Sequence, residues 1–109
     1  MCGILGFTGK GKVREIVREG LKALEYRGYD SCGYALLKNN ELTIKKRVGK
    51  GKIDELVEDL PECLPEKVSV IAHTRWATHG KVDITNAHPH NDCKQEIALV
   101  HNGIISNYI

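Results

Sequence analysis

A stripe of apolar residues at helical spacing is the strongest constraint on how this chain can fold. Between Lys12 and Tyr26, apolar residues recur at about the 3.6-residue interval of a helix, with charged residues between them. The pattern predicts an amphipathic helix over this range, and Gly28 is a plausible stop signal after it. The apolar positions are Val13, Ile16, Val17, Leu21 and Leu24.

Short apolar runs on either side of this helix predict strands. Ile4 to Thr8 is a brief apolar run that ends at Gly9, which suits a buried strand. Tyr34–Lys38 and Leu42–Val48 flank the turn-prone pair Asn39-Asn40 and predict a hairpin. The alternation in the second of these strands is imperfect, so we expect it near an edge of the sheet.

The second half of the chain contains another short helix, two more strands and a long polar connection. The spacing of Ile53, Leu56, Val57 and Leu60 predicts an amphipathic helix that Pro61 closes. The β-branched runs Val68–Ala72 and Ile97–Val100 predict strands. Between them, Thr74 to Asp92 is mostly polar, and a long polar connection inside a compact chain is more often functional than not.

The last residues predict the opening of a further helix. Apolar side chains follow Asn102-Gly103 at helical spacing, and the pattern stops after barely two turns. We therefore expect a truncated amphipathic helix here. Its apolar residues are Ile104, Ile105, Tyr108 and Ile109.

Composition excludes several classes of function. The 109 residues include 16 Lys and Arg against 14 Asp and Glu, with the two signs interspersed, so a nucleic-acid partner is not expected. With 41% apolar and 28% charged residues, the chain suits one soluble globular domain over residues 1–109. No apolar run approaches the roughly 20 residues that span a bilayer, and no export signal is visible. We expect a cytoplasmic protein without a membrane partner.

Four cysteines appear without the spacing of a disulfide or metal framework. Cys2, Cys32, Cys63 and Cys93 form no C-x-x-C pair, so reduced thiols are expected. Removal of Met1 would make the second residue the first, and would place a thiol beside a free α-amine. An α-amine has a reference pKa of about 7.7–8.0 and can take a proton from a thiol near neutral pH. The alternative is that Cys2 is simply a buried apolar residue, which position alone favours.

Two polar clusters could assist such a nucleophile. Asn102-Gly103 offers a side-chain amide and a backbone N–H, which could form an oxyanion hole worth about 2.7–4 kcal/mol per donor, or could be an ordinary tight turn. The segment from Arg75 to Gly80 gathers a guanidinium, a hydroxyl and an imidazole directly after a strand. Placed at a strand end, these groups could clamp an α-carboxylate.

Histidines near the C-terminus raise the possibility of a metal site. His88, His90, Cys93 and His101 are residue types that bind zinc, but their spacing matches no closed pair-of-pairs pattern. We expect structural histidines and neither a metal nor another cofactor, with a metal-binding module as the alternative.

Five sequence blocks, in this order and spacing, are similar to the glutaminase domain of the glutamine–fructose-6-phosphate aminotransferase family, a class-II glutamine amidotransferase. The resemblance runs over almost the whole chain. It implies an α+β fold, the four-layer αββα sandwich of N-terminal nucleophile hydrolases, of which this chain holds the first part. The blocks are Met1–Ile4, Leu24–Ser31, His73–Gly80, Asn86–His90 and Val100–Ile105.

The resemblance also implies roles for individual residues. Cys2 would attack the side-chain amide of L-glutamine and form a glutamyl thioester, with Asn102 and the Gly103 N–H as the oxyanion hole. Trp76 would contribute through its backbone and by covering the pocket, and Arg27 would support the amine of the nucleophile. Three side chains would hold the glutamine α-carboxylate, namely those of Arg75, Thr78 and His79.

The sequence departs from the family pattern in two ways. It holds no acidic residue downstream of Asn102-Gly103 to bind the glutamine amino group, and it holds no sugar-phosphate isomerase domains. We expect a fragment or a remnant gene product that has little stability or glutaminase activity alone. Its partners would be the rest of the glutaminase domain and the isomerase domains, in a full-length homo-oligomer that makes glucosamine 6-phosphate. The alternative is a non-catalytic module that binds glutamine weakly or only pairs with another subunit.

Overall fold

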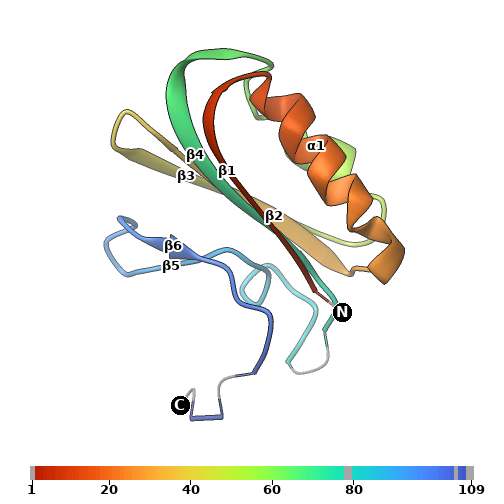
Figure 1. Ribbon diagram of the computed structural model, residues 1–109. Helices are drawn as coiled ribbons and strands as arrows, with labels where there is room; N and C mark the ends of the chain where they lie inside the picture. Colours follow the sequence, from red (N-terminus) through yellow and green to blue (C-terminus); the bar gives the residue numbers. More distant parts are fainter. Residues whose placement is uncertain (1, 78–79, 105, 108–109) are drawn as a thin grey trace.

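The computed structural model describes residues 2–77, 80–104 and 106–107 as an α+β arrangement around an antiparallel sheet (Figure 1). The four-stranded sheet has the order β1-β4-β2-β3, and a two-stranded sheet pairs β5 with β6. The elements are β1 Gly3–Gly11, α1 Val13–Ala23, the 3₁₀ helix η1 Glu25–Arg27, β2 Ser31–Lys38, β3 Glu41–Val48, α2 Ile53–Val57, β4 Leu64–Arg75, β5 His90–Asn91 and β6 Ala98–Leu99.

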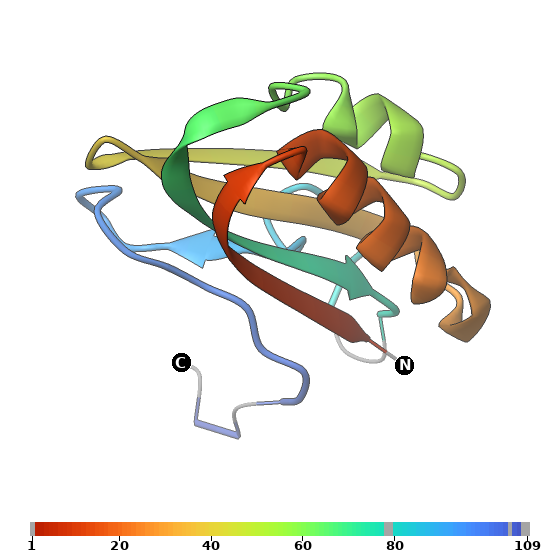
Figure 2. The ribbon, with the colours of Figure 1, turned by 45° about the horizontal axis from the view of Figure 1, so that its top comes forward.

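Both helices cover one face of the large sheet, and the β5–β6 segment lies against the other (Figure 2). The apolar stripe of α1 is buried at Val13, Val17 and Leu21, as the helical spacing predicts. It packs on the same core as α2 and the inward residues of β2 and β4. The sequence-based expectation of an α+β chain is therefore confirmed.

The first helix is shorter than its apolar pattern suggested. α1 ends at Ala23, and residues 25–27 form a 3₁₀ turn instead of continuing to Tyr26. The Leu24 N–H donates to the Leu21 carbonyl at 3.1 Å, an i to i−3 bond that tightens the last turn. Gly28, with φ of 78°, then ends the segment as expected.

The predicted hairpin is confirmed, although both strands begin before the predicted ranges. β2 and β3 pair from Ser31↔Val48 to Lys38↔Glu41. Asn39 and Asn40 both have positive φ, 51° and 63°, as a two-residue primed turn requires. β3 lies at the edge of the sheet, in agreement with its imperfect alternation.

The first strand differs from its prediction in burial. β1 is an edge strand with alternating exposure, not a fully buried one. Leu5 and Phe7 pack against the core under the helices, whereas Ile4 points to the other face and is 48% exposed. An edge strand is paired on one side only, and here the helices cover only one of its faces.

The long central strand β4 determines where the polar connection begins. It pairs with β1 through Gly3↔Thr74 and with β2 through Ser31↔Arg75. The start of β1, the start of β2 and the end of β4 therefore lie side by side, at the edge of the sheet that the strand ends form. This edge carries the candidate site.

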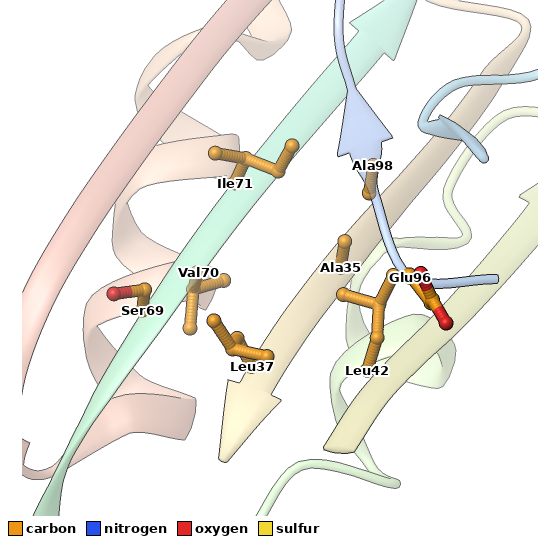
Figure 3. A pocket seen from close by; sticks show the side chains of 8 residues that line it. All are labelled: Ala35, Leu37, Leu42, Ser69, Val70, Ile71, Glu96 and Ala98. Atoms are coloured by element: carbon orange, nitrogen blue, oxygen red, sulfur yellow. The ribbon is translucent and has the colours of Figure 1, made fainter. Parts of the chain in front are cut away.

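The second face of the sheet is only partly covered. A cavity of about 180 Å³ lies between β2, β4 and the β6 segment (Figure 3). The predicted strand Ile97–Val100 shortens to Ala98–Leu99, and Leu99 is 52% exposed rather than buried. Among the described strands, β6 pairs with β5 alone. The cavity is lined by Ala35, Leu37, Leu42, Ser69, Val70, Ile71, Glu96 and Ala98.

The predicted C-terminal helix is absent from the residues that the structure describes in this segment. Ile104 is exposed, and Ser106 and Asn107 lie in a turn. Ile105, Tyr108 and Ile109 are outside the described residues. Within the described ranges, no helix has the length and apolar character needed to cross a membrane.

Candidate active site at the strand ends

Cys2 lies at the edge where the three strand ends meet. It is half-buried, and its Sγ is 4.0 Å from the carbonyl oxygen of Trp76, a weak thiol hydrogen bond. Next to it, Gly3 sits so close to β4 that a Cβ atom would lie 2.9 Å from Thr74 Oγ1 and 2.8 Å from a methyl group of Leu24. The missing side chain at Gly3 therefore lets the nucleophile candidate approach the end of β4.

Arg75 ends β4 and is almost fully buried, with 8% of its surface exposed. Its Nη1 donates to the Lys81 carbonyl at 2.8 Å, and the Asn86 side-chain amide donates to the same oxygen at 3.0 Å. Gly80, with φ of 84°, lies against both donor groups. The guanidinium therefore ties the Lys81 part of the polar connection to the end of β4, in addition to any role toward a ligand.

The structure describes the other expected site residues of this region to different extents. Trp76 is exposed, and its ring lies over Gly28, where a Cβ atom would be 3.3 Å from the ring. The backbone of Arg27 is in η1, but its side chain lies outside what the structure describes. Thr78 and His79 lie outside the described residues altogether.

Asp30 is a site residue that the sequence reasoning missed. Its Oδ2 accepts a hydrogen bond from the Ala77 N–H at 2.7 Å, and its backbone N–H donates to the Arg75 carbonyl at 2.8 Å. Asp30 therefore fixes the chain directly after β4, beside Cys2. Its position within the Leu24–Ser31 block was the available signal.

Several buried polar atoms at this edge have no hydrogen-bond partner among the described residues. They are Asp30 Oδ1, Ser31 Oγ and Thr74 Oγ1. A buried polar atom without a partner costs about 1–3 kcal/mol, so such atoms collect where function demands them. Their position next to Cys2 supports a functional reading of this edge.

A cluster of histidines surrounds His73, the residue before Thr74 in β4, on the face away from the helices. The His73 and His88 rings stack with centroids 4.1 Å apart, and His90 tilts against His88 at 4.3 Å. Burial lowers the pKa of His73 to about 4 and that of His88 to about 3, and it also lowers the pKa of His90. These rings are therefore neutral at pH 7.

The metal alternative gains no support from this arrangement. In the part of the chain that the structure describes, no three His, Cys, Asp or Glu side chains are grouped to hold a metal ion. His88 and His90 are engaged in ring contacts, and Cys93 is exposed.

Asn102 and Gly103 directly follow His101, which contacts the histidine cluster through its backbone. The His101 carbonyl oxygen lies 3.2 Å from His73 Nε2, and His73 pairs across the ladder with Ile4, two residues from Cys2. Asn102 and Gly103 are exposed. A Cβ atom on Gly103 would lie 3.0 Å from the His101 ring, so this turn is tightly folded.

The other cysteines differ from Cys2 in their surroundings. All four thiols are in the described part of the chain, and none forms a disulfide. Burial raises the pKa of Cys32 to about 12, so its thiol is protonated and unreactive at neutral pH. Cys63 and Cys93 are exposed.

Gly33→Ala is expected to displace the His88 segment from the sheet and to lower the free energy of unfolding by about 1–3 kcal/mol. A Cβ atom at this position of β2 would collide with the His88 carbonyl oxygen and would lie 2.9 Å from the Lys45 carbonyl. Both obstacles are backbone atoms, which cannot rotate away. Urea unfolding measures the change. Gly6→Ala is the matched control, since a Cβ atom there meets nothing within 4 Å, and equal losses in both variants would refute the argument.

Known proteins with similar sequences exist, although no family model matches the chain. It is 55% identical to glutamine–fructose-6-phosphate aminotransferase (isomerizing) of Pyrococcus horikoshii, 53% to that of Thermotoga maritima and 52% to that of Aquifex aeolicus. These matches cover 99–100% of this chain but 18% of each relative. The chain thus spans about a fifth of the length of these curated relatives.

Proposed function

Since this chain belongs to the glutamine–fructose-6-phosphate aminotransferase family, we propose that its Cys2 hydrolyses the side-chain amide of L-glutamine. The observation that carries the proposal is the meeting of Cys2 with the Arg75–Trp76 end of β4. A thiol, a buried guanidinium and a set of buried polar atoms converge there on the starts of two strands. Such convergence is what a nucleophilic site on an amino acid requires.

The proposed chemistry uses the nucleophile and its base on one residue. After removal of Met1, the α-amine of Cys2 accepts the thiol proton, and the sulfur attacks the amide carbon of glutamine. The oxyanion of the tetrahedral intermediate accepts hydrogen bonds from the Asn102 amide and the Gly103 N–H. The C–N bond then breaks, the α-amine returns its proton to the leaving ammonia, and water hydrolyses the thioester to glutamate.

Substrate recognition is proposed to use charge at the end of β4. Arg75, together with Thr78 and His79, holds the α-carboxylate of glutamine, since a guanidinium binds a carboxylate through paired N–H donors. Trp76 covers the pocket, and Arg27 supports the amine of Cys2. Asp30 keeps the Arg75–Ala77 turn in place through the hydrogen bonds described above.

In a protein of the length of the relatives, the ammonia is proposed to serve the synthesis of glucosamine 6-phosphate from fructose 6-phosphate. The partners are then the remainder of a glutaminase domain that completes a four-layer αββα sandwich, and sugar-phosphate isomerase domains in a homo-oligomer. We place this reaction in the cytoplasm, where unbridged thiols stay reduced.

A non-catalytic pairing module is the second candidate, and the apolar residues on the second face favour it. Large apolar side chains are exposed on β1, on β2 and in the β6 segment, and exposed apolar surface commonly packs against a partner. They include Ile4, Leu37, Ile97, Leu99 and Ile104.

By the complete protein we mean a protein that contains this chain and has the length of the relatives. A diazo ketone analogue of glutamine, added to the complete protein, separates the two candidates. Mass spectrometry of the peptides is expected to show one label, on Cys2, in a peptide that lacks Met1. L-glutamine should protect this thiol, and D-glutamine should not. Iodoacetamide should label the exposed Cys63 and Cys93 in a parallel sample, which controls for general thiol reactivity. Retention of Met1, or equal labelling of Cys63 by the analogue, would overturn the catalytic proposal.

A further inference from the structure

Imidazole side chains hold both backbone groups of residue 101. His73 Nε2 lies 3.2 Å from the His101 carbonyl oxygen, and the His101 N–H donates to His88 Nδ1 at 3.3 Å. A carbonyl oxygen only accepts, so His73 carries a proton on Nε2. A backbone N–H only donates, so Nδ1 of His88 carries none. The two bonds together assign the same neutral tautomer, with the proton on Nε2, to both rings.

His73 belongs to the sheet and His88 lies against it, whereas the segment that they hold is not part of it. His73 is fully buried in β4, and the His88 carbonyl is pressed against Gly33 of β2. The rings also stack on one another. By contrast, Val100 to Ile104 belongs to no helix or strand, and Asn102 is exposed. The bonds at residue 101 therefore join the segment that carries the Asn102–Gly103 turn to the sheet.

We propose that His73 and His88 are positioning residues for the oxyanion hole: they fix residue 101 from both sides and so set where Asn102 and the Gly103 N–H point. The proposal rests on the glutaminase function proposed above. Donors to an oxyanion act only when they are held at the place where charge develops, and a displacement of about 1 Å can cost about 100-fold in rate. Neither histidine needs to touch the substrate for this role.

The surroundings of the pair keep both rings in the required neutral form. Burial disfavours a second proton on each ring, and the titratable and charged groups that act on the pair are all basic. A protonated His88 would lose its acceptor and would repel the His101 N–H. The groups that face the pair are Lys46, Arg75, His90 and His101.

Asparagine and glutamine variants test the proposal with opposite expectations at the two positions. The Oδ1 atom of Asn stands where Nδ1 of His88 accepts, whereas the Nε2 atom of Gln stands where Nε2 of His73 donates. In the complete protein, we therefore expect His88→Asn and His73→Gln to keep kcat for ammonia release within about threefold of the wild type. His88→Gln and His73→Asn should lower kcat by about tenfold or more, with the KM for glutamine within about twofold.

Opposite preferences at the two positions, for Asn at position 88 and for Gln at position 73, distinguish positioning from support of the fold. All four variants place an uncharged amide in the same two sites, so a merely structural role would make Asn and Gln equivalent at each position or would follow size alone. Equal kcat for Asn and Gln at both positions, or losses confined to KM, would overturn the proposal. If instead Cys2→Ala retained ammonia release, the glutaminase function itself would fail, whatever the histidine variants did. Melting temperatures of the four proteins verify that each is folded.

Discussion

Cys2→Ala is expected to reduce glutamine-dependent ammonia release in the complete protein to background, a loss of at least about 10⁴-fold in kcat. Alanine removes the sulfur that attacks the amide, so no thioester can form, while the α-amine and the surrounding pocket stay. The side chain is small and only half-buried, so the fold should be little affected. Glutamine binding, measured by calorimetry, should change much less than turnover.

Matched cysteine variants make this result specific. Cys63→Ala and Cys93→Ala remove exposed thiols and should leave kcat within about twofold of the wild type. Cys32→Ala removes a buried thiol and should lower stability without abolishing turnover. Substantial ammonia release by Cys2→Ala, or its loss in Cys63→Ala, would contradict the assignment of the nucleophile.

Local sequence signals predicted those parts of the fold that local chemistry determines. The Asn39-Asn40 pair favours positive φ at two successive positions, and this alone fixes a hairpin register. The stripe of α1 likewise requires a buried face at Val13, Val17 and Leu21, whatever the partner is. Its length was overestimated because Leu24 fits the apolar spacing although its N–H already bonds to Leu21.

Burial of the strands could not be predicted in the same way, because it depends on what lies on each face. Ile4 and Leu99 belong to apolar runs that resemble buried strands, yet β1 is at an edge and β6 pairs only with a two-residue strand. An apolar run indicates that a strand is present. Its exposure follows from neighbours that come from distant parts of the chain.

The candidate site likewise combines features that the local sequence predicts with features that depend on distant parts of the chain. Cys2 and Trp76 are brought together by the antiparallel register of β1 and β4, which no local pattern specifies. The family resemblance identified them because it matched blocks from both strands. Asp30 and His73 lie inside those blocks, but their roles depend on hydrogen bonds to Ala77 and His101 that only the folded chain defines.

Asn102→Ala is expected to lower kcat by about 10²–10³-fold and to leave the KM for glutamine nearly unchanged, because an oxyanion donor acts in the transition state. The exposed side chain makes no core contact, so the loss should appear without a change in melting temperature. Arg75→Ala should show the opposite balance, with KM raised by about 10- to 100-fold as a charge-assisted contact to the α-carboxylate disappears.

The interpretation of Arg75 needs a control, since its guanidinium also holds the Lys81 carbonyl. Asn86→Ala removes the other side-chain donor to that oxygen and leaves the charge of Arg75 in place. If Arg75 acted only by holding the loop, Asn86→Ala would raise KM by a comparable factor. If Arg75 binds the carboxylate, Asn86→Ala should change KM by less than about threefold. Steady-state kinetics of the three variants decides the matter, and equal losses of kcat in Asn102→Ala and Arg75→Ala at unchanged KM would refute the division of roles.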